Sequence, residues 1–175
     1  MKKSILWPIF AILLAAALLF GLSIGMNGIA KANAEKEHMK LLQTLLPDSK
    51  TFYIEPHDGA DEIIQSVHKG ETGFVIETRT AGYAGDITMM IAVSTDGKVV
   101  GLRVMNMSET YGLGWTALTD ADFLGQFLNT SGDAEIGTNV DAVSGATVTS
   151  KAIARSVNAA VAYVTGADIG SSATG

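Results

Sequence analysis

A run of hydroxyl-bearing and small residues at positions 141–150 has the residue types best suited to chemistry. It reads Asp-Ala-Val-Ser-Gly-Ala-Thr-Val-Thr-Ser and lies directly before a stretch with helical periodicity. Gly145 and Ala146 leave the backbone accessible, and four hydroxyl groups flank them, on Ser144, Thr147, Thr149 and Ser150. The first N–H groups of a helix have no partner within the helix and carry partial positive charge. Together these features indicate an anion site, with phosphate as the expected anion.

Two other interpretations of this segment can be compared with its residue types. It is not a Walker-type phosphate loop, because the Gly-Lys-Ser/Thr ending of such loops is absent. A turn of small residues, in which Ser or Thr caps the following helix, explains the composition equally well. The residues alone leave that alternative open.

The composition narrows the chemistry further. The 175 residues include no cysteine, which excludes disulfides, cysteine-ligated iron–sulfur clusters, c-type haem attachment and cysteine nucleophiles. Any redox chemistry must therefore use an organic cofactor or a metal held without sulfur. The 12 Lys and Arg residues against 18 Asp and Glu residues give a net charge of −6, which disfavours nucleic-acid binding.

An antiparallel sheet is predicted for the middle of the chain. Its two most apolar strands span 87–93 and 99–105, and Asp96-Gly97 between them is a strong hairpin signal because glycine tolerates positive φ. A strand over 72–80 comes before them, followed by the tight connection Gly82-Tyr83-Ala84-Gly85. The segments before it are a short strand over 51–55, a loop over 57–61 and a stretch over 62–68 that is ambiguous between strand and helix.

Helices are expected before and after these strands along the chain. The first runs over 35–46 and ends at Pro47. A short second helix is capped by Thr119 or Asp120 and includes Phe123, Leu124, Phe127 and Leu128. A third, over 149–164, places Ile153, Val157, Ala160, Val161 and Val164 on one face, with Gly166 as its stop. The fold class is therefore α+β, an antiparallel sheet with packed helices.

The first thirty residues indicate a membrane anchor. Residues 5–24 carry no charge, and 20 helical residues span about 30 Å, the thickness of a bilayer core. Lys2 and Lys3 precede this run, so the N-terminus is expected in the cytoplasm and the rest of the chain outside. The alternative is a cleaved signal peptide, for which Ala32-Asn33-Ala34 supplies a small-residue site. The apolar run is longer than a usual signal segment, which favours the anchor.

The segment Asp141-x-x-Ser144-Gly145-Ala146-Thr147-x-Thr149 resembles the flavinylation motif of FMN-binding domains. Such domains occur in the G subunit of Rnf complexes and in the C subunit of sodium-pumping NADH:quinone reductases. The resemblance implies a phosphoester bond between FMN and the last threonine of the motif, which is Thr149. It also implies a flavin transferase of the ApbE type, which makes this bond from FAD with Mg²⁺. Ser144, Gly145, Ala146 and Thr147 would then surround the phosphate.

A second segment agrees with the same family. Residues 108–114, Ser-Glu-Thr-Tyr-Gly-Leu-Gly, resemble the Glu-Thr-Pro-Gly-Leu-Gly loop that lies near the flavin in these domains. The resemblance implies that Glu109, Thr110, Leu113 and Gly114 contribute to the cofactor site. Tyr111 stands where the family has proline. A plain hairpin or bulge turn is the alternative that the residues leave open.

The other candidates have ordinary structural explanations. His38, His57 and His68 show no metal-ligand spacing and are interpreted as surface histidines. Four methionines in apolar strands are expected to pack in the core: Met89, Met90, Met105 and Met107. Trp115 either contacts the flavin ring or is buried under the loop. Lys151 and Arg155 either approach the phosphate or form a solvated helix face.

The resemblance implies an electron-carrying subunit of a membrane-bound Rnf-type complex, which relays electrons between the ferredoxin and NAD sides and couples this transfer to ion translocation. The expected organisation is an anchor over 1–30, a membrane-proximal helix and linker over 31–59, an FMN-binding domain over 60–166 and a flexible tail over 167–175. A stand-alone, membrane-anchored flavoprotein for extracellular electron transfer is a second hypothesis. A non-redox binding or envelope module is a third.

Overall fold

The computed structural model of the chain describes residues 32–58, 60–107 and 113–167. The chain forms two units, Met1–Leu41 and Leu42–Gly175. The expected anchor over 1–30 and the tail from residue 168 onward lie outside the described residues. Within the described ranges, no helix has both the length and the apolar character needed to cross a membrane. The division of the chain at residues 30, 59 and 166 stays a prediction.

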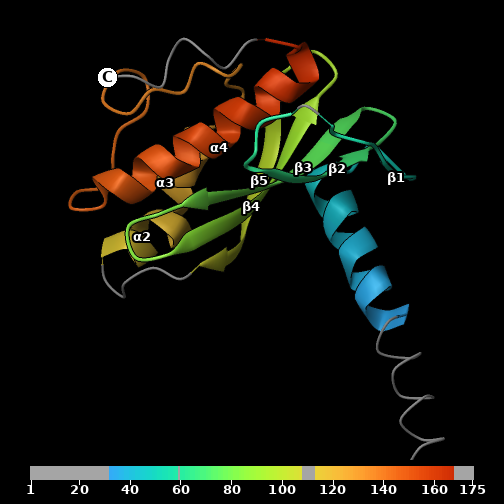
Figure 1. The fold of residues 1–175 in the computed structure, drawn as a ribbon, viewed down its shortest axis with the longest axis horizontal. Coiled ribbons are helices and arrows are strands. Elements are labelled where there is room, and N and C mark those ends of the chain that lie inside the picture. Colours follow the sequence, from blue (N-terminus) through green and yellow to red (C-terminus); the bar gives the residue numbers. More distant parts are fainter. Residues whose placement is uncertain (1–31, 59, 108–112, 168–175) are drawn as a thin grey trace, which may run out of the picture. The chain divides into compact units, whose positions relative to one another are not determined.

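In the described part of the chain, five strands form one antiparallel sheet in the order β1-β2-β3-β4-β5 (Figure 1). Their bounds are β1 Tyr53–Ile54, β2 Ile64–Lys69, β3 Gly73–Ala81, β4 Asp86–Ser94 and β5 Val99–Met107. Each strand pairs with its neighbour along the chain, which turns and loops can connect without a crossover. The α+β class with an antiparallel sheet is confirmed, and the ambiguous segment over 62–68 is a strand.

The two predicted tight connections are both present. Gly97 adopts φ 78°, the left-handed conformation that glycine accepts without cost, and its N–H donates to the Ser94 carbonyl oxygen at 3.0 Å. The Gly82 N–H donates to the Gly85 carbonyl oxygen at 2.8 Å. The Gly82–Gly85 turn connects β3 to β4. These two strands pair without a bulge, from Gly73 opposite Ser94 to Ala81 opposite Asp86.

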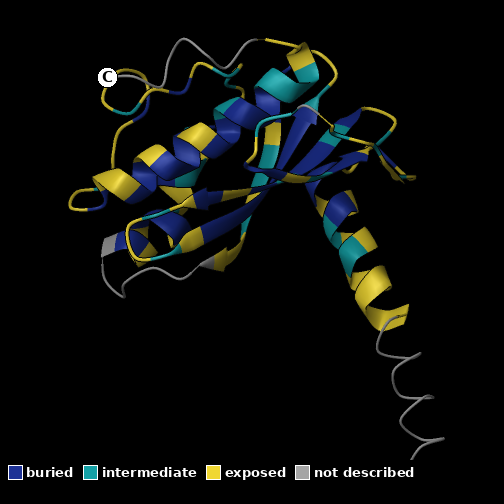
Figure 2. Cartoon of the chain, in the orientation of Figure 1, coloured by how far each residue is buried: buried dark blue, intermediate teal, exposed yellow. Residues whose placement is uncertain are grey.

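The helix α4, Thr147–Thr165, covers one face of the sheet (Figure 1), and its inner side is buried (Figure 2). Ile76 on β3 pairs with Ile91 on β4, and both side chains are fully buried in the main core. The Thr80 and Ser156 hydroxyls form a buried hydrogen bond of 2.6 Å between β3 and α4. The predicted apolar face of α4 is confirmed at Ile153, Val157, Ala160 and Val161, and Val164 is partly buried.

The opposite face of the sheet is partly covered by residues 42–46. Ala92 pairs with Gly101 on this face, and a methyl group added at Gly101 would come within 2.9 Å of the Leu45 carbonyl oxygen. Leu42, Leu45 and Leu46 are all buried. They belong to the predicted helix that ends at Pro47, which the structure places over residues 32–45.

The short helices differ from the prediction. Asp120 caps α3 as expected, accepting hydrogen bonds from the N–H groups of Asp122 and Phe123 at 2.9 and 3.1 Å. However, α3 spans only Ala121–Gly125, so the inclusion of Phe127 and Leu128 in the helix was wrong. The chain instead continues in tight turns, in which the N–H groups of Gln126 and Phe127 bond to carbonyls three residues back. A further helix, α2 Leu113–Thr119, was not predicted, because Gly112 and Gly114 suggested a loop.

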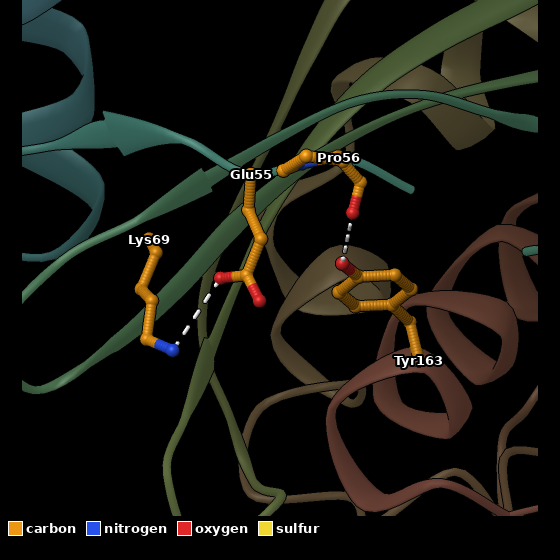
Figure 3. A network of polar contacts seen from close by, with 4 residues as sticks. All are labelled: Glu55, Pro56, Lys69 and Tyr163. Carbon is orange, nitrogen blue, oxygen red and sulfur yellow. Dashed lines mark hydrogen bonds and ion pairs between the residues drawn. The ribbon is translucent and has the colours of Figure 1, made fainter. Parts of the chain in front are cut away.

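A polar network connects the end of α4 to β1 and β2 (Figure 3). The Tyr163 hydroxyl donates to the Pro56 carbonyl oxygen at 3.3 Å. Lys69 Nζ lies 3.5 Å from Glu55 Oε2 and 5.2 Å from the centroid of the Phe74 ring. Burial, and secondly the negative charge of Glu55, raise the pKa of the Tyr163 phenol.

This raised pKa predicts a pH-dependent contribution to stability. The folded protein holds the Tyr163 proton more tightly than the unfolded chain, whose tyrosine pKa is about 10. The contribution is therefore complete below about pH 10 and is lost as the pH rises beyond it. We expect the difference in unfolding free energy between wild type and Tyr163→Phe to shrink between about pH 8 and about pH 11. Urea unfolding of the full-length chain in detergent measures this. Tyr53→Phe, at an exposed position, is the control, and an unchanged Tyr163→Phe difference would contradict the prediction.

Gly73 allows β3 to lie close to β4. A Cβ at this position would lie 2.3 Å from the Val93 carbonyl oxygen, and backbone cannot move aside as a flexible side chain can. We expect Gly73→Ala to lower the free energy of unfolding by about 1–3 kcal/mol. In the control Gly125→Ala, a Cβ would meet no atom within 4 Å, so the change should stay within about 0.5 kcal/mol. Equal urea midpoints for the two variants would show that the sheet tolerates the extra methyl group.

Candidate functional site

The beginning of α4 is a helix start without a side-chain cap. The helix starts at Thr147, two residues earlier than predicted, which places Thr149 within its first turn. Ala146 is the N-cap residue and makes no side-chain hydrogen bond there, and Gly145 before it adopts φ 78°. The alternative prediction, in which a Ser or Thr side chain caps this helix, is therefore wrong. The N–H groups of Thr147, Val148 and Thr149 have no carbonyl partner within the helix and are suited to an anion.

Ser150 ties the preceding turn to this helix start. Its hydroxyl donates to the Ala146 carbonyl oxygen at 2.9 Å and accepts from the Val143 N–H at 3.3 Å. The Ala146 N–H in turn donates to the Val143 carbonyl oxygen at 2.9 Å. Ser150 is fully buried, so its hydroxyl is fixed within the fold. We call this arrangement of Val143, Ala146 and Ser150 the Ser150 clasp.

Thr149 differs from the other hydroxyl residues of the motif. Ser144 and Thr147 are exposed, whereas Thr149 is 1% exposed. Among the described residues, three buried side-chain oxygens lack a hydrogen-bond partner: Thr149 Oγ1, Thr78 Oγ1 and Glu55 Oε2. The Glu55 oxygen faces Lys69 at 3.5 Å. An unpaired buried hydroxyl costs about 1–3 kcal/mol, so Thr149 is a position where the fold keeps a polar oxygen at a cost in stability.

The family loop is described only at its end. Glu109 and Thr110, like Tyr111, lie outside the described residues. Leu113 is the first residue of α2, and Gly114, in the first turn of that helix, is buried. α2 contacts both α4 and β5. Figure 1 draws α2, the β3–β4 turn and the beginning of α4 at the same end of the domain.

The remaining candidates have mixed outcomes. Met89 and Met90 are buried as predicted, but Met105 is 43% exposed, because its side chain lies on the face of β5 away from the core. The interpretation as surface histidines is wrong for His68, which is 9% exposed on β2 within the sheet. Trp115 is 40% exposed and thus not buried under a loop. Lys151 and Arg155 are exposed on α4, which agrees with a solvated helix face.

Sequence reasoning missed two side chains that hold the motif in place. Ser150 was counted among the hydroxyl groups, but its clasp was not foreseen. Gln126 Oε1 accepts a hydrogen bond from the Asp141 N–H at 2.8 Å, which connects the turn after α3 to the start of the motif. A serine four residues after a glycine–alanine helix start is a local signal that could have indicated the first bond. The Gln126 contact spans 15 residues and has no such signal.

Comparisons with known proteins identify the domain in which this site lies. The family model described as FMN-binding domain matches residues 82–162, which include the β3–β4 turn and most of α4. The G subunit of the ion-translocating oxidoreductase complex of Methanosarcina acetivorans is 33% identical over 152 residues, 78% of each chain.

Two further relatives match over a shorter region. The G subunit of the proton-translocating ferredoxin:NAD(+) oxidoreductase complex of Clostridium ljungdahlii is 38% identical over 99 residues, 53% of each chain. The Na(+)-translocating counterpart of Acetobacterium woodii is 32% identical over 98 residues, 51% of this chain and 47% of that protein. These two alignments thus span about half of each relative. The chain belongs to the family of G subunits of ion-translocating oxidoreductase complexes and has that family's FMN-binding domain.

Proposed function

We propose that the chain carries FMN through a phosphoester bond to Thr149 and relays electrons within an Rnf-type membrane complex. The observation that supports the attachment most directly is Thr149 Oγ1, a buried hydroxyl without a partner in the first turn of a helix without a side-chain cap. Attachment of a phosphoryl group requires an oxygen that can bond to phosphorus and N–H groups that can face the negative charge. The hydroxyl of Thr149 supplies the oxygen, and the helix start supplies the N–H groups.

The attachment step is a transfer of the FMN half of FAD, catalysed by a flavin transferase of the ApbE type with Mg²⁺. Thr149 Oγ1 forms a bond to the phosphorus next to the riboflavin, and the pyrophosphate bond of FAD breaks. AMP leaves, and the hydroxyl proton of Thr149 is released. The resulting phosphodiester carries one negative charge, which the helix start stabilises by about 0.3–1 kcal/mol. The exposed Ser144 and Thr147 hydroxyls and the bare backbone at Gly145 and Ala146 are suited to surround its oxygens.

The flavin ring is proposed to lie against the segment that leads from β5 into α2. Glu109, Thr110, Leu113 and Gly114 are the residues that the family resemblance assigns to this contact. The support from the structure is that α2, which begins at Leu113, contacts α4. Bound FMN supplies one- and two-electron redox chemistry at its ring, and the protein tunes this chemistry by hydrogen bonds and nearby charge.

Gly114 gives a test of this contact. We expect Gly114→Val to shift the flavin absorption spectrum, because the added side chain would crowd the ring, while covalent flavin remains at Thr149. Gly125→Val is the control, since Gly125 is exposed and a Cβ there meets nothing within 4 Å. A spectrum and redox potential equal to those of wild type would remove α2 from the flavin site.

The proposed role of the whole chain rests on its relatives. The names of two relatives specify ferredoxin:NAD(+) oxidoreductase complexes, one proton-translocating and one Na(+)-translocating. We infer that this chain relays electrons between the ferredoxin and NAD sides of such a complex, beside other membrane subunits. The expected anchor over 1–30 would hold the FMN-binding domain on the extracytoplasmic side of the membrane.

The experiment for this proposal is production of the full-length chain with and without a flavin transferase in the same cells. We expect in-gel flavin fluorescence under denaturing conditions only when the transferase is present. The native membrane complex is then purified through this chain, and its subunits are identified by mass. Copurified Rnf-type membrane subunits support the role in a complex, whereas a fluorescent chain that purifies alone from native membranes would favour the stand-alone flavoprotein.

A further inference from the structure

We propose that Ser150 is a positioning residue for flavin attachment, because its hydroxyl holds the turn before α4 in the form that presents Thr149. The inference rests on the proposed attachment at Thr149 and adds a residue outside the motif that ends at Thr149. The Ser150 clasp is defined by bonds to Ala146 O at 2.9 Å and from Val143 N at 3.3 Å.

The geometry gives Ser150 a task that no neighbouring hydroxyl shares. Both hydrogen-bonding roles of its hydroxyl are used within the clasp. Ser150 itself is therefore poorly suited to accept a phosphoryl group. Thr149, one residue earlier in the same turn, has the opposite status: its buried oxygen has no partner. The clasp thus separates the hydroxyl that holds the turn from the hydroxyl that has no hydrogen-bond partner.

The turn needs such a tie because little else in its sequence fixes it. Gly145 adopts φ 78° and is free to adopt many other conformations in the unfolded chain. Ala146, as N-cap, has no side chain that could bond to the helix. Without the Ser150 hydroxyl, the Val143 N–H loses its acceptor and the Gly145–Ala146 backbone loses a link to α4. The helix-start N–H groups and Thr149 Oγ1 would then no longer be held in one arrangement around the incoming phosphate.

Placement matters strongly for this reaction. A threonine hydroxyl is a weak nucleophile, and small displacements of a reacting group reduce rates by large factors. We therefore expect Ser150→Ala to lower the maximal rate of attachment by about 10-fold or more, measured at saturating FAD and transferase. Ser150→Cys nearly keeps the volume but weakens both hydrogen bonds, so its rate should lie between those of wild type and Ser150→Ala.

Ser156→Ala is the matched control. Ser156 is also fully buried on α4 and also hydrogen-bonded, to Thr80 at 2.6 Å, but it lies almost two turns further along the helix. Both alanine variants lose one buried hydroxyl, with two hydrogen bonds at Ser150 and one at Ser156, so both should be destabilised. Only Ser150→Ala should be slow to accept flavin, which a purely structural role would not produce.

The experiment uses the purified, unmodified full-length chain in detergent, with FAD, Mg²⁺ and flavin transferase. Covalent flavin is followed by in-gel fluorescence and normalised to folded protein. A slow Ser150→Ala beside a normal Ser156→Ala supports the proposal. An equal or faster rate in Ser150→Ala overturns it, and if that variant does not fold, a wild-type rate in Ser150→Cys overturns it. Absence of covalent flavin on wild type would contradict the proposed function itself.

Discussion

Thr149→Val is expected to abolish covalent flavin while the protein folds at least as well as wild type. Valine keeps the branched shape of threonine but lacks the oxygen that would bond to phosphorus. The removed hydroxyl is buried and has no partner, so its loss should leave the free energy of unfolding unchanged or raise it by about 1–3 kcal/mol. In-gel fluorescence of the chain produced with transferase measures the flavin, and urea unfolding measures the stability.

Two threonines provide controls for this variant. Thr78 also has a fully buried hydroxyl without a partner, but on β3, so Thr78→Val should gain similar stability and keep its flavin. Thr147 is exposed within the motif, and Thr147→Val should leave the bond possible. Flavin that stays covalently bound to Thr149→Val would show that another residue is the attachment point.

The largest loss of stability is expected for Phe127→Ala. Phe127 is fully buried in the main core, and its ring packs edge-on against that of Phe123 at a centroid distance of 5.3 Å. Truncation leaves a cavity in addition to the lost burial, so the free energy of unfolding should fall by about 3–5 kcal/mol. Urea unfolding of the full-length chain in detergent gives this value.

The next residue is the control for Phe127. Leu128 is 42% exposed, and Leu128→Ala should change the free energy of unfolding by less than about 1 kcal/mol. The two apolar neighbours thus differ chiefly in burial. Similar losses in both variants would mean that the turn after α3 does not place Phe127 in the core.

The sheet could be predicted because its signals are local. Moderate alternation of apolar residues indicates β3, apolar runs indicate β4 and β5, and Asp96-Gly97 specifies the hairpin between the last two. The helix α2 was not predicted, because Gly112 and Gly114 near its start are typical of a loop. In the folded chain this helix contacts α4 and β5, and these contacts favour the helix. Met105 and His68 were misjudged because their burial depends on which face of the sheet each side chain takes.

The sequence predicted only part of the candidate site. Four hydroxyl groups stand within residues 141–150, and residue types alone do not rank them. Thr149 was selected by family resemblance, and its burial without a hydrogen-bond partner is a property of the folded chain that residue types do not reveal. The clasp of Ser150 depends on a turn whose backbone is set by Gly145 in a left-handed conformation, which sequence spacing does not reveal.

Peptide mass spectrometry of the 141–155 segment tests the central claim most directly. The segment is taken from wild-type full-length chain produced with an active flavin transferase. Attachment through Thr149 predicts a peptide heavier by one FMN less one water, with fragment ions that place the added mass on Thr149. An unmodified segment, or an added mass on Ser144, Thr147 or Ser150, would contradict the claim.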